Sequence, residues 1–544
     1  MANVKFQRQE LEKHIKLTDE VIEKIGLFGI PVESLTEKEI ELEILSNRPD
    51  LLSLQGFVRA IKAYLGKEKG LKKYKINKPE KDYKAIIESE VKNIRPYIAC
   101  AIATNLSLDN EKISSLIDLQ EKLHATLGRK RKKVAIGIYP LEKINLPITY
   151  TAIRPKEIKF IPLGSEKEMD ANQILQKHPT GKEYASLLQS YNKYPVFIDS
   201  KKQILSMPPI INSNDIGRIT EQTKSVFIEC SGSDLNTLKK TLNIIVTTLA
   251  DMGAKIYQME LHYGKTREIT PDFKLEIIKI SLENTNKLLG LNLKEKELEN
   301  LLQKMGHNYK RGRVEIPAWR TDILHEVDII EEIVIAYGYD NLIPELPNIS
   351  TIAEETKESR IKKKITDILI GLGLIETSSY HLIKAEEKDK SKIDNIVELQ
   401  DSKTEYKFLR PNLLIPALRI LAENKDADYP QRLFEIGKIF TSERTSSESG
   451  INEKENIIIY ISPANFTGLK QSLDYLTKLL NINYAIRESS HPNLVEGRSA
   501  SVIINNKNIG YIGDIHPKTL QHWNIKMPVA VLEISLEEIY KQFN

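Results

Sequence analysis

The segment from residue 320 to residue 340 constrains the fold of this chain more than any other stretch. Its apolar residues recur at steps of three and four, which predicts an amphipathic helix with one buried stripe. The stripe comprises Ile323, Val327, Ile330, Val334 and Tyr337. Asp322 is expected to cap the helix, because its short side chain can accept a free backbone N–H of the first turn. A domain core must therefore lie against this stripe.

Three acidic residues are expected on the opposite face of the same helix. Asp328, Glu331 and Glu332 stand at positions i, i+3 and i+4, so their carboxylates should share one face that points away from the core. Like charges at this spacing repel each other, and a bound cation such as Mg²⁺ would relieve the repulsion. An acidic face that is merely solvated is the alternative, since helices tolerate such faces.

Composition limits the classes to which the chain can belong. A length of 544 residues predicts three to five domains, and 41% hydrophobic with 28% charged residues is typical of a globular protein. No apolar run is long enough to span a membrane and no signal peptide is recognisable, so we expect a cytoplasmic protein. Cys100 and Cys230 are far apart, which argues against a disulfide framework or a zinc site. The net charge of +4 is too small to indicate nucleic-acid binding by itself.

The chain divides into four predicted domains of mixed α/β and α+β character. Residues 1–75 alternate helical and extended patterns, with a strand at Glu41–Leu45 and a helix that Asp50 is expected to cap. The Lys-rich stretch Lys67–Lys84 is predicted to be a linker or an exposed loop. Residues 85–265 form an α/β domain, 268–345 a small domain, and 350–544 a last one.

The 85–265 domain is predicted from strands separated by turns and from two long helices. The strands are expected at Tyr97–Thr104, Val134–Ile138, Pro195–Asp199, Gln203–Asn212 and Ser225–Asp234, and the helices at Lys112–Leu127 and Leu235–Met252. Asp234 is the expected cap of the second helix. The loop Gly128–Lys133 is strongly basic; it could neutralise RNA phosphates, or it could be a solvated turn.

The 268–345 domain shows the pattern strand, helix, helix, strand, helix, which resembles a DNA-reading helix-turn-helix. The candidate recognition helix from Lys294 carries at least as many acids as bases, which disfavours duplex DNA. In the last domain, a basic amphipathic helix at Ser359–Leu372 precedes a strand pattern at Leu374–Leu382.

Several of these motifs resemble the beta subunit of phenylalanyl-tRNA synthetases of the archaeal and eukaryotic type. The resemblance lies in Asn47–Arg59, Leu409–Arg419, Arg432–Phe440, Gly510–Pro517 and the segment 320–341. The family's metal-binding helix has Asp, a second Asp six residues later, and Glu-Glu at nine and ten. Asp322, Asp328, Glu331 and Glu332 occupy these places. The resemblance implies Mg²⁺ shared with the alpha subunit.

The 85–265 domain resembles the family's editing domain, which hydrolyses tyrosine wrongly esterified to the phenylalanine tRNA. Carried over by motif, Ser206, Glu229 and Ser231 would line the pocket, with Asn212 nearby. A carboxyl such as Glu229 can pair with the phenol hydroxyl that distinguishes tyrosine from phenylalanine. The two serines could hold the ester or a hydrolytic water, or they could be strand-end hydroxyls bonded to backbone. The chain departs from the family pattern in having Glu229 for Asp and Tyr139-Pro140 for His-Asp.

The 350–544 domain resembles a class II synthetase domain that has lost its chemistry. Such an active site needs arginines that neutralise the transferring phosphoryl group, one of them in a Gly-x-Gly-x-Gly-x-Glu-Arg motif. The corresponding stretch, Ala530–Ser535, has neither the glycines nor the arginine. The resemblance thus implies a catalytically silent antiparallel-sheet domain in a heterotetramer of two alpha and two beta subunits that charges tRNA(Phe). A free-standing tRNA-ester hydrolase or a helix-turn-helix binding protein is the alternative.

Overall fold

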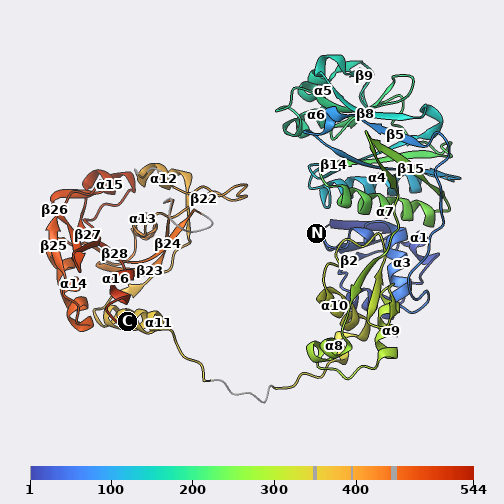
Figure 1. The fold of residues 1–544 in the computed structure, drawn as a ribbon. Coiled ribbons are helices and arrows are strands. Elements are labelled where there is room, and N and C mark those ends of the chain that lie inside the picture. The colour runs from blue at the N-terminus through green and yellow to red at the C-terminus, as the bar shows by residue number, and fades with distance from the viewer. Residues whose placement is uncertain (1, 347–351, 392, 394–395, 443–449, 544) are drawn as a thin grey trace. The chain divides into compact units, whose positions relative to one another are not determined.

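The computed structural model describes residues 2–346, 352–391, 393, 396–442 and 450–543. The chain forms two compact units, residues 1–345 and 346–544 (Figure 1). The expected start of the last domain, residue 350, lies outside the described residues. The architecture is mixed α/β with several sheets, as the sequence predicts. No helix in the described ranges is both long and apolar enough to cross a bilayer.

The N-terminal lobe is a three-stranded antiparallel sheet covered by short helices. Its elements are β1 (Ala2–Gln7), α1 (Arg8–Glu12), α2 (Asp19–Leu27), β2 (Val32–Leu35), β3 (Glu39–Ile44) and α3 (Leu54–Tyr64). Strand β3 is central and alternates buried Ile40, Leu42 and Ile44 with more exposed glutamates. The expected cap Asp50 is wrong: Ser53 caps α3 by accepting from the Gly56 N–H, while Asp50 pairs with Arg48.

The stretch Lys67–Lys84, predicted to be a linker or an exposed loop, is a largely irregular segment that is attached to the packed structure. The Gly70 N–H donates to the Gln303 carbonyl at 2.7 Å, and the Tyr74 hydroxyl donates to Asp251. Strand β4 (Ile76–Asn77) pairs in parallel with β15 (Lys255–Tyr263). A free linker is thus excluded because Tyr74 packs edge-on against Trp319, whereas most lysines of this stretch are exposed, as expected of a loop.

An eleven-stranded sheet forms the centre of the first unit. Its main path runs β13-β12-β11-β8-β5-β15-β6-β14-β7. The strands not yet given are β5 (Lys84–Ile87), β6 (Tyr97–Thr104), β7 (Val134–Pro140), β8 (Ile148–Ile153), β11 (Tyr194–Ile198), β12 (Ile204–Met207), β13 (Ile211–Asn212), β14 (Val226–Gly232) and β16 (Thr266–Thr270). Helix α7 (Leu235–Asp251) packs on β6 and β14 and also contacts α3, so it joins the sheet to the N-terminal lobe (Figure 1).

Two local predictions in this region are confirmed and one is refined. The Asp234 side chain accepts the N–H groups of Asn236 and Thr237 and caps α7. Helix α4 (Asn110–Ala125) covers most of the predicted span, and Asp109 caps it. The predicted strand Gln203–Asn212 is two strands, because Pro208 and Pro209 interrupt it with a turn.

Residues 276–341 form a small α+β region. Its elements are β17 (Glu276–Lys279), α8 (Leu282–Leu289), α9 (Glu295–Lys304), β18 (Asn308–Lys310), β19 (Arg313–Ile316) and α10 (Glu326–Tyr337). The three strands pair in the order β17-β19-β18, so β18 is an element that the sequence pattern did not predict. Gly290 ends α8 in the left-handed conformation with φ 66°.

Helix α10 differs from its prediction in start and in phase. It begins at Glu326, three residues later than expected, and its N-cap is His325 rather than Asp322. Val327, predicted to be buried, is 50% exposed. The buried face consists of Ile329, Ile330, Glu332, Ile333, Val334 and Ala336. The helix is thus rotated so that Glu332, expected on the outer face, points inward.

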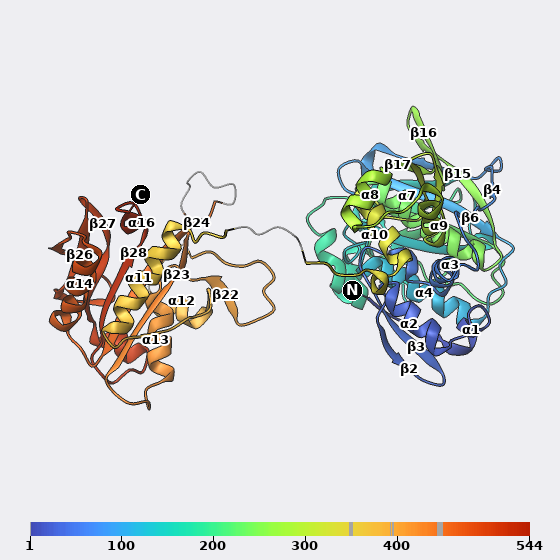
Figure 2. The same ribbon diagram turned by 90° about the horizontal axis from the view of Figure 1, so that it is seen from below.

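The second unit contains a seven-stranded sheet in the order β20-β23-β24-β28-β27-β26-β25 (Figure 2). The strands are β20 (Ile375–Glu376), β23 (Gln431–Thr441), β24 (Asn452–Ser462), β25 (Ala485–Glu488), β26 (Leu494–Ile504), β27 (Lys507–Ile515) and β28 (Ala530–Ser535). All neighbours are antiparallel except β20 and β23. The predicted strand Leu374–Leu382 is interrupted: β21 (Leu382–Lys384) pairs separately with β22 (Tyr406–Leu409).

Each face of this sheet has its own core. Along β24, Ile457, Ile459 and Ile461 join the cluster under α11 (Lys357–Gly371) and α14 (Phe466–Leu480). Ile458 and Tyr460 join the cluster under α13 (Leu414–Glu423) and α15 (Pro517–His522). Strand alternation sends successive side chains to opposite faces, so both faces are covered. Helices α12 (Ala385–Ser391) and α16 (Glu537–Tyr540) complete the unit.

Candidate functional sites

Glu229 lies in β14, a strand of the central sheet that is buried along its whole length. Strand β14 pairs with β6 on one side and β7 on the other, and Glu229 is opposite Cys100 and Gly137. Ile228 and Cys230 point toward the core that includes α7, so Glu229 projects from the other face. Its side chain is only 1% exposed. The sheet therefore holds a carboxyl group in an apolar interior.

A tyrosine that sequence reasoning noted only as a departure from the family pattern contacts this carboxyl. The Tyr139 hydroxyl lies 3.3 Å from Oε1 of Glu229 and 3.2 Å from Oδ1 of Asn212. Asn212 is opposite Ser206 in the β12–β13 register. The Oγ of Ser206 and the Oε2 of Glu229 are buried and have no partner at hydrogen-bonding geometry in the described part of the chain, although Ser206 lies near enough to the Tyr139 hydroxyl to oppose the rise of its pKa that burial causes. These two atoms are unused hydrogen-bonding capacity, which is rare in a native interior.

Ser231 has a different role from the one expected. Its side chain is fully buried, and its Oγ accepts from Nε of Arg95 at 3.1 Å. The Arg95 Nη2 also donates to the Ser231 carbonyl at 2.6 Å. The structure thus gathers Glu229, Asn212 and Ser206 around Tyr139, while Ser231 anchors a buried arginine. Sequence alone gave no sign of Arg95, because it is 136 residues away from Ser231.

Burial keeps the Glu229 carboxyl largely protonated at neutral pH. Burial raises the pKa of Glu229 to about 8, against the lowering effect of the Arg95 charge and of the hydrogen bond from Tyr139. A carboxyl that is largely protonated at pH 7 can donate a hydrogen bond as well as accept one. Buried groups with such shifts are candidates for functional sites.

A cavity of about 160 Å³ adjoins Glu229 and Asn212. Other lining residues are Gln120, Glu121, His124, Arg131, Thr180 and Ile210. Arg131 belongs to the basic loop, where three successive residues have positive φ angles of 48°, 52° and 63°. Its Nη1 donates to the Ile210 carbonyl at 2.7 Å and its Nη2 to Glu121. Arg131 is therefore fixed at the cavity, while Arg129, Lys130 and Lys132 of the same loop are exposed.

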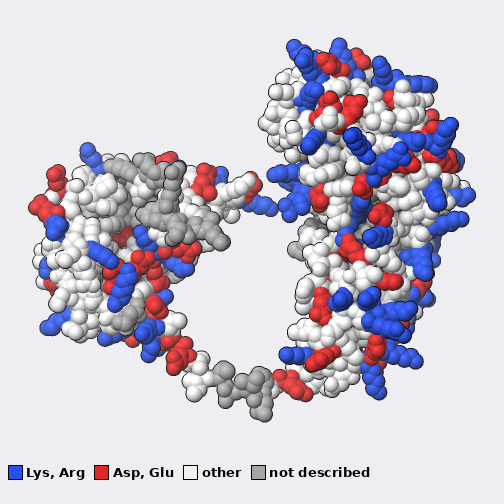
Figure 3. All heavy atoms as spheres, in the orientation of Figure 1, with Lys and Arg blue, Asp and Glu red and all other residues white. Residues whose placement is uncertain are grey.

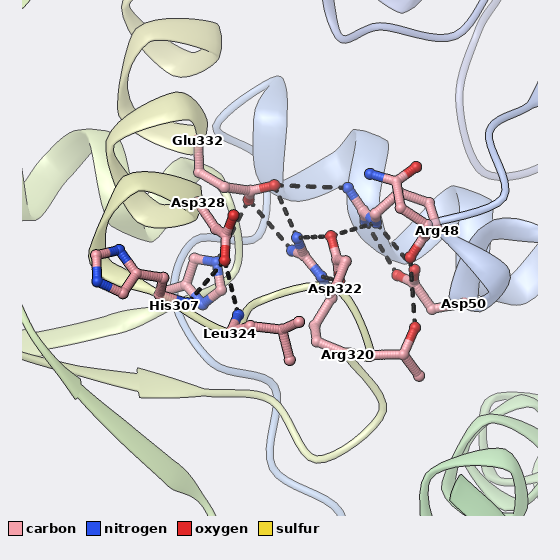
Figure 4. Close-up of polar contacts among 11 residues, drawn as sticks. Arg48, Asp50, His307, Arg320, Asp322, Leu324, Asp328 and Glu332 are labelled. Carbon is pink, nitrogen blue, oxygen red and sulfur yellow. Dashed lines mark hydrogen bonds and ion pairs between the residues drawn. The ribbon is translucent and has the colours of Figure 1, made fainter. Parts of the chain in front are cut away.

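The acidic segment forms a second polar cluster, in which arginines meet the acids (Figure 4). Arg320 binds Asp322 through two hydrogen bonds of 2.8 Å and Glu332 at 2.7 Å. Arg48 binds Asp50 at 2.9 and 3.0 Å, and its Nη1 lies 3.8 Å from Glu332. Burial alone would raise the pKa of Glu332, yet the Arg320 charge and the His307 hydrogen bond hold it well below its usual value. The expected outward-facing acidic surface is therefore wrong for Glu332.

The remaining two acids lie in other environments. The Asp328 carboxylate accepts the N–H groups of Leu324 and His325 at 2.8 and 2.7 Å, so it stabilises the first turn of α10 (Figure 4). Glu331 is exposed. Carboxylate oxygens are the donors that Mg²⁺ prefers. However, across the described residues no group of three or more His, Cys, Asp or Glu is placed to hold a metal ion. The donors fit the ion in kind but not in arrangement.

Buried polar groups on the sheet face beneath α13 of the second unit are bonded to one another. Arg410, 1% exposed, donates to Glu435 at 2.7 Å, to Ser379 at 2.8 Å and to the Lys438 carbonyl at 2.7 Å. On the same sheet Glu533 accepts from the Leu413 N–H, Asn456 and Tyr511. These buried charges are used for internal contacts, so this arginine is not available to a nucleotide phosphate.

Comparison with known proteins finds matches along most of the chain. Residues 81–247 match the model of the B3/4 domain, 278–339 that of the tRNA synthetase B5 domain, and 343–536 that of the phenylalanyl tRNA synthetase beta chain CLM domain. The chain is 38% identical over 505 residues to the phenylalanine--tRNA ligase beta subunit of Thermococcus sibiricus, covering 91% of this chain and 90% of that one. It is 33% identical to the Archaeoglobus fulgidus beta subunit, with 99% of each covered.

A solved structure gives the same result for the first unit. An N-terminal fragment of the phenylalanyl-tRNA synthetase beta subunit from Pyrococcus horikoshii is 39% identical, with a TM-score of 0.59. The match covers 62% of this chain and 99% of the fragment. Fold and matches together define a subunit of an aminoacyl-tRNA synthetase. The chain belongs to the family of phenylalanine--tRNA ligase beta subunits, which confirms the resemblance seen in its motifs.

Proposed function

We propose that this chain supports a catalytic alpha subunit in a heterotetramer of two alpha and two beta subunits. The holoenzyme joins phenylalanine to tRNA(Phe) at the expense of ATP in the cytoplasm, and residues 346–544 are its catalytically silent synthetase-like part. The observation that carries this proposal is that Arg410, buried on the sheet, is held by Glu435 and Ser379. Adenylate formation needs a cation that is free to meet the phosphoryl group.

Phenylalanine-dependent exchange between ATP and pyrophosphate tests this function. The purified beta chain is expected to be inactive, and activity should appear when the alpha subunit is added. Activity of the beta chain alone would overturn the proposal. Absence of exchange even with alpha present would favour a free-standing tRNA-ester hydrolase or a helix-turn-helix binding protein.

Contact with tRNA(Phe) is proposed for the basic loop beside the cavity. Lys and Arg side chains are interspersed with Asp and Glu over the visible face of each unit, so no face in view carries one sign alone (Figure 3). Arg129, Lys130 and Lys132 are exposed, while Arg131 fixes the loop from inside. Each phosphate contact that is lost should reduce the salt dependence of binding by about one unit of slope. Lys130→Ala is the variant to compare with wild type in a salt titration of tRNA(Phe) binding.

Hydrolysis of tyrosine wrongly esterified to tRNA(Phe) is proposed for the pocket at Glu229. The unpartnered Oε2 of Glu229 and Oγ of Ser206 support it. A phenol hydroxyl donates one hydrogen bond and can accept another. The Glu229 carboxyl and the Ser206 hydroxyl can serve as the two partners. Phenylalanine lacks the hydroxyl and would leave both atoms unpaired, which is a strong basis for rejection. Ser231 contributes through Arg95, whose charge acts on the Glu229 carboxyl.

Replacement of Glu229 tests this second activity. Glu229→Ala should abolish hydrolysis of preformed tyrosyl-tRNA(Phe) by the holoenzyme. Glu229→Gln should retain part of it, because an amide resembles the protonated carboxyl that predominates at pH 7. Exposed Glu111→Ala is the control for a general loss of negative charge. Unchanged turnover in Glu229→Ala would remove this residue from the pocket.

Binding of Mg²⁺ by Asp322, Asp328, Glu331 and Glu332 is proposed as a property of the assembled enzyme. Exposed Glu331 is available, whereas Asp322 and Glu332 are bound to Arg320 in the beta chain itself. Ligands from the alpha subunit would have to complete the site. Mn²⁺ used as a paramagnetic probe should therefore bind the alpha–beta complex and not the beta chain alone. Tight binding to the beta chain alone, or none to the complex, would overturn this assignment.

A further inference from the structure

Tyr139 is a fully buried polar side chain that contacts two residues lining the candidate pocket, Glu229 and Asn212. It lies in β7, is 0% exposed, and stacks on Phe227 with ring centroids 5.8 Å apart and 25° between the planes. Its hydroxyl contacts Oε1 of Glu229 and Oδ1 of Asn212. The ring is thus fixed by packing at one end and by hydrogen bonding at the other. Such a side chain can fix the orientation of the groups that it contacts.

The contact between the phenol and the carboxyl depends on Gly137. Gly137 precedes Tyr139 by two residues on the same face of β7 and lies opposite Glu229. A Cβ atom at this position would lie 2.2 Å from the Tyr139 hydroxyl and 2.6 Å from Oε1 of Glu229. Any larger residue would push the two groups apart. The glycine therefore provides the space in which the phenol meets the carboxyl.

The two oxygens of Glu229 have different surroundings. Oε1 is held by Tyr139, whereas Oε2 has no partner among the described residues. A carboxyl bound at one oxygen cannot rotate freely about its last bond, so the direction of the other oxygen is fixed. Glu229 also lines the cavity of about 160 Å³.

We propose that Tyr139 is a positioning residue of the aminoacyl-ester pocket: it holds one oxygen of Glu229 and so presents the other to the hydroxyl that distinguishes a tyrosyl from a phenylalanyl ester. This inference rests on the ester hydrolysis proposed above. Tyr139 itself need not touch the substrate.

The test compares Tyr139→Phe with Tyr150→Phe in the alpha–beta holoenzyme. Both variants remove one hydroxyl from a fully buried tyrosine of the same sheet, and Tyr150 donates to the Arg95 carbonyl instead of to Glu229. The readout is kcat/KM for hydrolysis of tyrosyl-tRNA(Phe) divided by that for phenylalanyl-tRNA(Phe). Tyr139→Phe should lower this ratio by about tenfold, the value of one good hydrogen bond. Tyr150→Phe should leave it within about twofold.

An infrared titration gives a second readout that does not require hydrolysis. The band of the protonated carboxyl, identified by its loss in Glu229→Gln, reports the pKa of Glu229. Because the Tyr139 hydrogen bond lowers this pKa, Tyr139→Phe should move the titration midpoint to higher pH. Tyr150→Phe should leave the midpoint in place. Aminoacylation with the alpha subunit shows whether each variant is folded.

The outcomes decide two claims: the positioning role of Tyr139 and the ester hydrolysis itself. An unchanged selectivity ratio, or a midpoint that does not move, overturns the positioning role. Faster tyrosyl hydrolysis by Tyr139→Phe also overturns it, since the phenol would then obstruct the substrate. If wild type hydrolyses no tyrosyl-tRNA(Phe), the proposed ester hydrolysis fails. The infrared midpoint then decides separately whether Tyr139 positions Glu229.

Discussion

Glu229 and Glu332 are both buried, yet their environments have opposite effects. Glu229 is 1% exposed and its pKa is raised, because burial outweighs the more distant charge of Arg95. Glu332 is 5% exposed and its pKa is lowered, because Arg320 binds it directly. Burial penalises the charged form in both cases, and the presence of a bonded cation decides the sign. A buried carboxyl with unused hydrogen-bonding capacity marks a candidate ligand site, whereas a fully paired one marks a structural contact.

The largest effect is expected from removing the cation of Glu332. Arg320→Ala leaves Glu332 and Asp322 without their main partner, which should lower the free energy of unfolding by about 3–5 kcal/mol. The chain has two tryptophans, Trp319 beside the cluster and Trp523 in the second unit. Denaturant unfolding followed by fluorescence in a Trp523→Phe background therefore reports on the first unit. Exposed Arg313→Ala is the control, and a loss below 1 kcal/mol in Arg320→Ala would contradict the structural role.

The next effect is a pH dependence that distinguishes the two glutamates. The pKa of Glu229 rises from 4.5 to about 8 on folding, so folding favours its protonated form. Its contribution to stability is complete below pH 4.5 and is lost as the pH rises through about 8. Relative to Glu229→Gln, wild type should lose on the order of 2–4 kcal/mol between pH 5 and pH 9. Glu332 has the opposite sign: its contribution is present above pH 4.5 and is lost as the pH falls. Parallel stability curves for wild type and Glu229→Gln would refute the Glu229 assignment.

A smaller effect is expected at Gly137. In Gly137→Ala the new methyl group would collide with the Tyr139 hydroxyl and with Glu229, so one of them must move. Overpacking of this kind costs about 1–3 kcal/mol of unfolding free energy. Gly253→Ala is not a matched control, because φ is +99° there; Gly26→Ala, in helix α2 with open space around it, is suitable. Stability equal to wild type would show that the space above Gly137 is not occupied as described.

The smallest effect is expected at the acid next to Glu332. Glu331 is exposed on α10, so Glu331→Gln should change the free energy of unfolding by less than about 0.5 kcal/mol. The same denaturant titration used for Arg320→Ala measures it. A large loss would show that the two neighbouring glutamates do not differ as their environments indicate.

Sequence patterns predicted features that depend on neighbours in the chain. Strand β14 and the Asp234 cap of α7 were found because alternation, turn residues and a capping side chain are all local signals. The family resemblance suggested Ser206, Glu229 and Ser231 as site residues by their positions. The partners of these residues were missed: Arg95 binds Ser231 over 136 residues of chain, and Tyr139 binds Glu229 over 90.

The acidic helix shows the same limit more clearly. The spacing predicted that Asp328, Glu331 and Glu332 share one face. It could not reveal that Glu332 is buried against Arg48 and Arg320. Arg320 was visible in the segment and could have been considered as an internal partner. Arg48 could not, since a contact between segments so far apart has no periodic signature.

The contact between the N-terminal lobe and the acidic segment bears on how the protein is made. Asn47 and Thr321, which bond across this junction, are 274 residues apart. At about 5–20 residues per second, a ribosome needs some tens of seconds to synthesise the chain between these two residues. During that interval Arg48 has Asp50 beside it but not yet Asp322 or Glu332. The N-terminal lobe therefore lacks these two partners until the segment that follows the central sheet has been synthesised.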